Sequence, residues 1–161
     1  MRNKTVTERG TYKQKVNAAL FKSQAIRDML IGDTTGMSAS EIRDKFKYHV
    51  KSHLFIDDTI EETDTFIFYD VQIPRVGENI KTVKLYIYVV CHRDILDECE
   101  YEGYTGNRAD ILSEMICDVL INDEDVTRSF GIGKLQLDSV DIYNSKRFYG
   151  CVLQFDVPNF S

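Results

Sequence analysis

The sequence predicts an α+β protein with a mainly antiparallel four-stranded sheet packed against helices, in the order α-α-β-β-α-β-β. Apolar residues recur at helical spacing in the first part of the chain, and two pairs of later segments are dense in Ile, Val, Phe and Tyr. A third helical pattern separates those two pairs. With 161 residues, 43% of them hydrophobic, we expect residues 1–161 to form a single domain.

Two helices are expected before the first strand. Apolar residues follow helical spacing from Thr11 to Ile31, and Gly32 stands where a C-terminal cap belongs. Ser38 and Glu41 then have the spacing of a capping box. The second helix begins there and is expected to continue through four apolar residues at four-residue steps: Ile42, Phe46, Val50 and Leu54.

The first pair of strands is expected at residues 65–73 and 82–92, joined by a loop that contains Pro74 and Gly77. In the second of these strands Leu85 and Ile87 share one face, whereas Tyr86 and Tyr88 share the other. Both faces therefore require cover. We expect helices on one face and another subunit on the other, with Tyr86 and Tyr88 at that interface.

A third helix is expected at 107–121, with Asn107 as its cap and Asp110 in its first turn. Two further strands follow at 133–142 and 148–157. The alternation of the former slips at Asp138 and Ser139, which indicates a bulge or bend. The third helix joins two hairpins, so we expect it to pack on one face of the sheet.

Charge and composition exclude several classes of protein. The formal net charge of −6, from 20 Lys and Arg against 26 Asp and Glu, disfavours a protein that grips nucleic acid. Charge repulsion is still compatible with an acidic wall past which DNA slides. The amino terminus lacks the apolar run of a signal peptide, and the longest apolar stretch, 85–91, has the length of a strand. We therefore expect neither a secretory signal nor a membrane span.

No group of residues forms a complete catalytic or metal site, so we predict no enzyme activity, no catalytic residue, no metal and no cofactor. His49 and His53 lie four residues apart on the expected second helix, but a third ligand is missing, which favours solvated or interfacial histidines. A small metal-dependent nuclease remains an alternative. Its carboxylates and lysines would come from a set that straddles a hairpin loop: Asp70, Glu78, Lys81 and Lys84.

Cysteines and acidic segments allow two more predictions. The four cysteines stand far apart and are expected to be reduced and mostly packed in the core: Cys91, Cys99, Cys117 and Cys151. The acidic segments 57–64 and 94–102 are expected to be solvated loops or a docking face for a basic partner. The second possibility leaves a monomeric acidic adaptor or inhibitor as a further alternative.

In the order of its elements, the chain resembles the tail terminator and head-to-tail joining (neck) proteins of tailed bacteriophages. The resemblance extends over about residues 11–157. It is carried by the opening helix at 16–32, the paired strands, the helix that begins with Asn107-Arg108-Ala109-Asp110 and the closing strand at 149–155.

The resemblance implies a structural virion protein rather than an enzyme. Such subunits form a homo-oligomeric ring, commonly of six, that caps the tail tube and connects it to the head. The implied partners are the tail tube protein and the head connector proteins, while DNA passes through the lumen without specific binding. The resemblance also implies a place in the neck of the virion, after assembly in the host cytoplasm and without a membrane.

Overall fold

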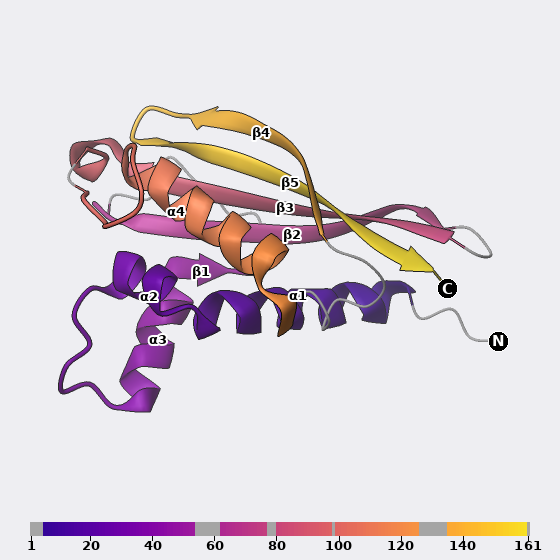
Figure 1. Cartoon of the computed structure of the whole chain (residues 1–161), viewed down its shortest axis with the longest axis horizontal. Helices are drawn as coiled ribbons and strands as arrows, with labels where there is room; N and C mark the ends of the chain where they lie inside the picture. Colours follow the sequence, from indigo (N-terminus) through magenta and orange to yellow (C-terminus); the bar gives the residue numbers. More distant parts are fainter. Residues whose placement is uncertain (1–4, 54–61, 77–79, 98, 126–134, 161) are drawn as a thin grey trace.

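A computed structural model describes residues 5–53, 62–76, 80–97, 99–125 and 135–160 of the chain. Within these ranges a sheet is covered on one face by helices, so the α+β class is confirmed (Figure 1). The elements follow in this order: α1 (Thr5–Lys22), α2 (Gln24–Ile31), α3 (Ala39–His49), β1 (Val50–Lys51), β2 (Thr65–Val76), β3 (Ile80–His92), the 3₁₀ turn η1 (Arg93–Ile95), α4 (Arg108–Cys117), the π-helical turn η2 (Asp118–Asn122), β4 (Gln136–Asn144) and β5 (Phe148–Phe160).

The sheet differs in one respect from the predicted four-stranded antiparallel sheet. It has five strands in the order β1-β2-β3-β5-β4, and β1 pairs with β2 in parallel, which makes the sheet mixed. The four predicted strands are present and antiparallel to their neighbours. The added strand starts at Val50, which pairs with Ile67 and is 6% exposed. Joining the sheet edge therefore buries this β-branched side chain.

Both helices predicted for the first part of the chain differ from their expected bounds. The first is divided at Ser23, whose hydroxyl accepts a hydrogen bond from the backbone N–H of Ile26 at 3.3 Å and so caps a separate helix, α2. The second ends at His49, because the next two residues enter the sheet; Leu54 lies outside the described residues. Its predicted start is confirmed: the Ser38 hydroxyl accepts from the N–H of Glu41 at 3.2 Å.

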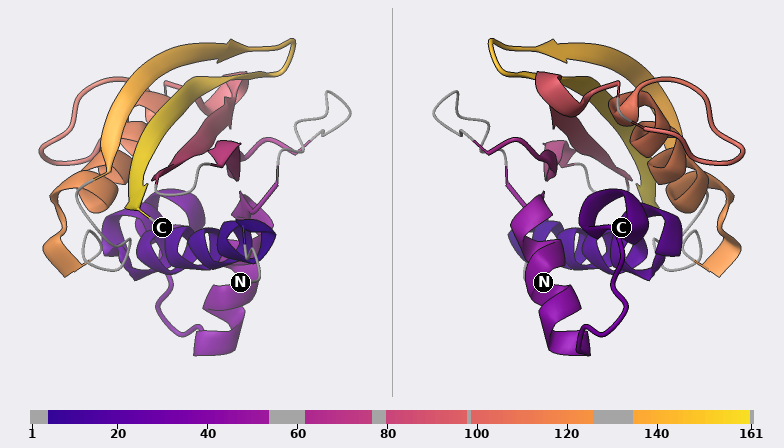
Figure 2. Two further views of the ribbon diagram at one scale, coloured as in Figure 1. Left: turned by 90° about the vertical axis from the view of Figure 1, so that its right-hand side faces the viewer. Right: turned by 90° about the vertical axis from the view of Figure 1, so that its left-hand side faces the viewer.

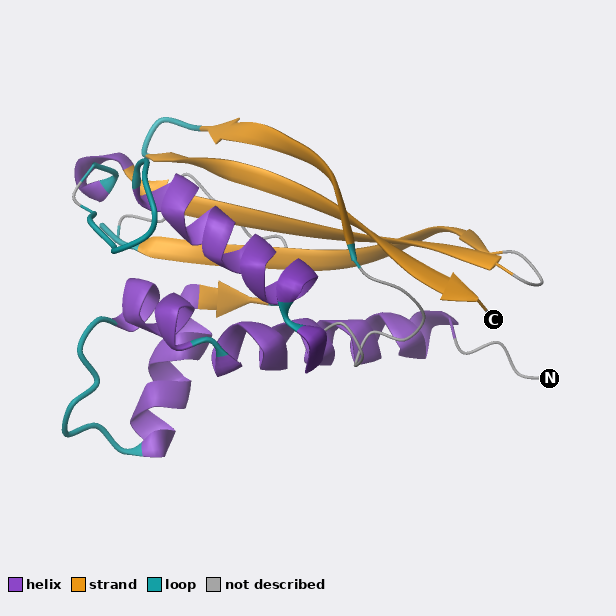
Figure 3. Ribbon diagram, viewed as in Figure 1, coloured by secondary structure: helices purple, strands orange, loops and turns teal. Residues whose placement is uncertain are grey.

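The helix expected at 107–121 is confirmed as α4 with its π-helical extension. Asn107 and Asp110 form a reciprocal capping box: the Asn107 side chain accepts from the Asp110 N–H at 2.9 Å, and the Asp110 carboxylate accepts from the Asn107 N–H at 3.3 Å. The first of these bonds satisfies an amide that has no partner inside the helix. The capped helix lies across β3 and β5 (Figures 1 and 3).

The main core lies between the sheet and the helices. The sheet curves around them, with α1 along β2 and α4 across the middle strands (Figure 2). Side chains from α1, α2, α3, α4 and one face of β1, β2, β3 and β5 contribute to the core. Its fully buried members include Val16, Leu20, Ile26, Ile67, Leu85, Ile87, Val89, Leu112, Ile116, Leu153 and Phe155.

The opposite face of the sheet carries a smaller apolar cluster. As predicted, Leu85 and Ile87 are buried on the helix side, while Tyr86 and Tyr88 alternate with them and are half-buried. Tyr88 packs against this second cluster, as does Tyr143 of β4. The cluster is formed by buried residues of β2, β3 and β5: Phe66, Phe68, Val90 and Phe148.

Candidate functional site

Strand β4 exposes three apolar side chains at one edge of the sheet. Leu137, Val140 and Ile142 are 38%, 57% and 70% exposed, and we call them the β4 apolar row. Their register partners in β5 are the buried residues Phe155, Leu153 and Cys151. Because directly paired residues of antiparallel strands share a face, the row continues the core-forming face of the sheet beyond the cover of the helices.

The bulge predicted at Asp138 and Ser139 is confirmed, and it shapes this row. The pairing of β4 with β5 shifts between Leu137 and Ser139, so Asp138 is the extra residue. Leu137 and Val140 are three positions apart and would lie on opposite faces of a regular strand. The bulge brings them to the same face, which makes the row continuous along β4.

Carboxylates lie close to the β4 apolar row. On α4, Asp110 and Glu114 are both exposed, and the Cys151 thiol lies 3.8 Å from the Asp110 carboxylate. Asp138 and Asp141 are exposed on the opposite face of β4, since Asp141 alternates with Val140 and Ile142 and Asp138 accepts from Gln154 at 3.2 Å. The exposed surface at this edge therefore combines apolar side chains with negative charge.

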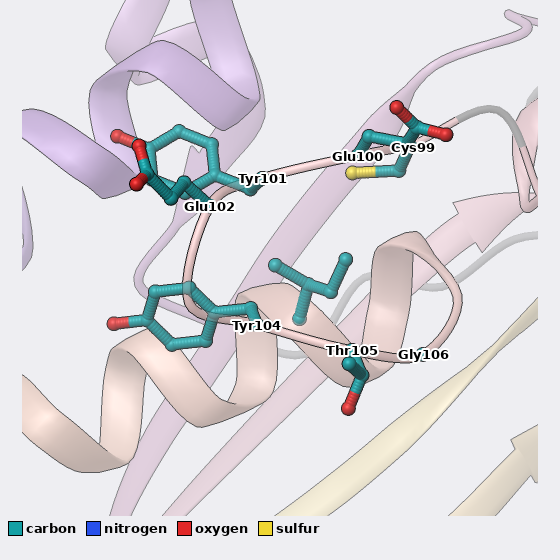
Figure 4. Close-up of a pocket in the computed structure, with 8 residues that line it drawn as sticks. Cys99, Glu100, Tyr101, Glu102, Tyr104, Thr105 and Gly106 are labelled. Atoms are coloured by element: carbon teal, nitrogen blue, oxygen red, sulfur yellow. The ribbon is translucent and has the colours of Figure 1, made fainter.

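A second acidic surface is an open pocket of about 560 Å³ in the loop before α4 (Figure 4). Tyr101 and Tyr104 stand with their rings edge to face, 6.0 Å between centroids. The Tyr104 hydroxyl donates to Asp118 at 2.9 Å, and this bond, helped by burial, raises the pKa of Tyr104. Glu100 and Glu102 are exposed beside the rings. Aromatic faces next to carboxylates suit a cationic side chain.

A second pocket, of about 440 Å³, lies between α1 and the junction of α3 with β1, and we call it the basic pocket. Lys47 supplies its positive charge, whereas the ammonium of Lys13 is paired with Asp70 at 2.9 Å. The Tyr69 hydroxyl donates to the Lys13 carbonyl at 3.0 Å, and burial raises the pKa of Tyr69 to about 12. The lining residues are Lys13, Gln14, Asn17, Ala18, Lys47, Val50, Ser52 and Tyr69.

Charge is divided unevenly along the chain. Residues 1–53, which contain α1, α2, α3 and β1, have eleven Lys and Arg against five Asp and Glu. Residues 54–161 have nine against twenty-one. The net charge of −6 thus combines a basic first third of the chain with an acidic remainder.

The candidate nuclease residues are bound to other partners. Asp70 accepts from Arg9 at 3.1 Å and forms an ion pair with Lys13 at 2.9 Å. Burial opposes ionisation of Asp70, but the Lys13 bond, the Val71 N–H and both cations outweigh it and lower the pKa of the carboxyl. Lys84 pairs instead with Asp156. Glu78 and the side chain of Lys81 lie outside the described part of the chain.

The two histidines do not share a helix face, because α3 ends at His49 and His53 follows the short strand β1. His49 is also buried rather than solvated: its Nδ1 donates to the Thr65 carbonyl at 2.7 Å, with Asp64 at 3.7 Å. His53 is exposed. Among the described residues, no group of three or more His, Cys, Asp or Glu is arranged to hold a metal ion.

The four cysteines are free thiols. Cys91 and Cys151 are buried and Cys99 and Cys117 are half-buried, which agrees with the predicted packing role. Burial raises the pKa of Cys91 and Cys151, and it raises the pKa of Cys117 to about 12. These three thiols are therefore protonated at neutral pH, which disfavours a nucleophilic role.

Sequence reasoning missed both the β4 apolar row and the basic pocket. Alternating apolar residues in β4 indicate a strand with one apolar face, but they do not show that the strand lies at an edge of the sheet beyond the helices.

The two acidic segments predicted from the sequence lie in different surroundings. Of the segment 57–64, only 62–64 belong to the described residues, where Asp64 lies near His49. The segment 94–102 includes four of the residues that line the tyrosine-bearing pocket.

The helices in the described ranges include none with the length and apolar character needed to cross a membrane.

Comparisons with known proteins give one match. The sequence model of the YomW family matches residues 15–157, which is most of the chain. No curated protein matches the sequence. The chain therefore belongs to the YomW family, a family of phage-like proteins.

Proposed function

We propose that this protein is a structural subunit of a phage neck, a tail terminator or head-tail joining protein that assembles into a homo-oligomeric ring. The observation that carries the proposal is the β4 apolar row. Val140 and Ile142 are 57% and 70% exposed, although their partners Leu153 and Cys151 belong to the core. A strand face of this kind, left without cover in one copy, is typical of a surface that another protein chain buries.

Energetics support an interface at this place. Burying apolar surface contributes roughly 25 cal/mol per Å² removed from water. The β4 apolar row lies on the same face of the sheet as the core residues of β5. A partner that covers the row therefore continues the packed core with few voids. The carboxylates of Asp110 and Glu114 provide a polar rim of the kind that surrounds apolar contacts in stable interfaces.

The neck role is supported by the resemblance of the element order to neck proteins and by membership of a phage-like family. In this role the ring caps the tail tube, meets the head connector and lets DNA pass through its lumen. The excess of carboxylates after residue 53 is compatible with passage, because like charge keeps DNA from adhering to the wall. The protein then resides in the neck of the virion.

Native mass spectrometry and electron microscopy of the purified protein test the proposal. The expected mass is several times the 18.6 kDa of one chain, and the particles should be rings with an axial opening. Added to purified tail tubes, the rings should be found at one end of each tube. A protein that stays monomeric at high concentration and fails to join tubes or connectors would falsify the neck assignment.

A monomeric adaptor is the second candidate, and the loop pocket favours it. Tyr101 and Tyr104 stand beside Glu100 and Glu102, a combination that fits a lysine or arginine side chain. A monomer that binds an oligolysine peptide, and loses that binding on Tyr104→Ala, would support the adaptor.

The nuclease alternative has less support, because Asp70 is paired with Lys13 and Lys84 is paired with Asp156. Magnesium-dependent DNA cleavage that is abolished by Asp70→Ala would restore it.

A further inference from the structure

We infer that copies of this chain associate head to tail, with the β4 apolar row of one copy docked against the basic pocket of the next. The inference rests on the proposed function, because it presupposes a homo-oligomer, and it names the two surfaces that meet. The occupant of the β4 edge is thus a second copy of this chain, presented through α1 and the junction of α3 with β1.

Charge complementarity is the first argument. The exposed carboxylates of Asp110 and Glu114 on α4 lie on the side of the sheet that the β4 apolar row faces, whereas Lys13 and Lys47 line the basic pocket. The described residues 5–53, which form α1, α2, α3 and β1, carry nine basic against five acidic residues, so attraction extends beyond the pocket itself. Complementary potentials of this kind steer encounter and fix the orientation of partners.

The same charges oppose a two-fold contact through β4. In such a contact both copies use the same patch, so Asp110 and Glu114 of one copy would approach the same acidic patch of the other. Juxtaposed like charges at an interface cost several kcal/mol. A contact between two different surfaces avoids this repulsion.

The position of the two surfaces permits both to be used at once. Strand β4 is one edge of the sheet, and β1, whose Val50 lines the basic pocket, is the other. Figure 1 shows β4 on one side of the molecule and α1 and α3 on the opposite side. One copy can therefore receive a neighbour on each side, and a heterologous contact of this type closes into a ring when the rotation between copies allows it.

Local structure favours side-chain docking over addition of a strand. The bulge at Asp138 interrupts the regular pairing of β4, and charged residues on the strand protect its outer edge. The receiving surface also offers apolar material, since Ala18 is exposed in the lining of the basic pocket.

Two variants, each with one altered surface, test the inference. The row variant combines Val140→Thr with Ile142→Lys, which removes apolar contacts and places a cation opposite the lysines. The pocket variant combines Ala18→Glu with Lys47→Glu, both at exposed helix positions that tolerate Glu. Lys146→Glu is the control for charge reversal, because Lys146 is exposed in the β4–β5 turn and belongs to neither surface. Circular dichroism and thermal unfolding verify that each variant folds.

We expect each variant alone to be monomeric, with the dissociation constant of the contact raised at least tenfold, while Lys146→Glu assembles as the wild type does. An equimolar mixture should give a heterodimer of twice the 18.6 kDa chain mass, because the intact row of the pocket variant docks on the intact pocket of the row variant. The inference is overturned if the folded pocket variant still assembles, or if the mixture stays monomeric; the neck proposal survives both results. A monomeric wild type defeats the neck proposal itself.

Discussion

Cys151 and Ile142 face each other across β5 and β4, yet Cys151 is 8% exposed and Ile142 is 70% exposed. The layer of helices covers the first side chain and leaves the second uncovered, within one pair of strands. Buried and exposed apolar residues on the same face should therefore differ sharply in what they contribute to the stability of one copy.

A pair of alanine substitutions measures this difference. Leu153→Ala should lower the free energy of unfolding by about 3 kcal/mol, because it opens a cavity in the core. Val140→Ala, at the register partner, should change the unfolding free energy of the monomer by less than about 0.5 kcal/mol. Urea unfolding at a concentration where the protein is monomeric gives both values. Similar losses for the two variants would mean that the row is covered within one copy.

Gly150 is predicted to be intolerant of any side chain. A Cβ added there would overlap the carbonyl oxygen of Val89 on the neighbouring strand, and backbone of a central strand cannot move away easily. Gly150→Ala should therefore destabilise the fold by about 2 kcal/mol or more. Gly10→Ala is the matched control: its Cβ meets nothing within 4 Å, and alanine in α1 should stabilise by roughly 0.5–1 kcal/mol. Thermal unfolding of both variants tests the contrast.

Acidification should weaken the link between α1 and β2. The pKa of Asp70 in the folded protein lies below its usual value of 3.8, so its ion pairs with Arg9 and Lys13 contribute fully above about pH 4. That contribution is lost as the pH falls through the lowered pKa. Asp70→Asn should cost about 1 kcal/mol at neutral pH. The cost should shrink below pH 4, and a pH-independent difference from wild type would contradict the ion-pair explanation.

Tyr86 and Tyr88, predicted from the sequence to lie at a subunit interface, should now behave differently from each other. Tyr88 contacts Tyr143 with ring centroids 6.2 Å apart and packs on the second cluster, so Tyr88→Ala should destabilise the monomer. Tyr86→Ala should leave the monomer stable and, if the opposite face meets a subunit, weaken assembly by on the order of 2 kcal/mol. Sedimentation velocity separates the two effects. An unchanged distribution of species for Tyr86→Ala removes this tyrosine from the interface.

Thiol reactivity should follow burial. At about pH 8 the folded protein should react slowly at Cys91, Cys117 and Cys151, whose raised pKa keeps them as thiols. In denaturant all four cysteines should react rapidly. Peptide mapping after labelling identifies the cysteines that have reacted. The Cys99→Ser variant lacks the half-buried thiol that contacts Met29, so comparison with wild type shows how much of the labelling occurs at Cys99. Rapid labelling of Cys117 in the folded state would contradict its packed position.

Local signals in the sequence predicted most of the fold. The capping residues Ser38 and Asn107, the period-two alternation of Leu85 with Tyr86 and the slip at Asp138 are short-range patterns, and each matches the structure. The misjudged boundaries depend on tertiary contacts. Val50 fits the helical stripe of α3 equally well, but pairing with Ile67 draws it into the sheet.

The candidate surface could not be predicted in the same way. Val140 and Leu153 have the same local pattern, and only the strand order, which places β4 outside β5, distinguishes the exposed residue from the buried one. The ion pairs of Asp70 likewise join residues about sixty positions apart. The uneven distribution of charge along the chain can be counted from the sequence. Only the structure shows that α1 and β4 lie on opposite sides of the molecule (Figure 1).

Because of this uneven distribution of charge, the two ends of an incomplete assembly differ from each other. In a row of copies joined head to tail, every internal contact satisfies one basic and one acidic surface, so an unfinished arc always ends in one free surface of each sign. The two ends attract each other, and the attraction grows as they approach within a Debye length of about 8 Å at physiological salt. A free copy offers the same attraction to either end, so the rotation between neighbouring copies decides between a closed ring and an open filament, and raising the ionic strength should weaken every contact of the arc.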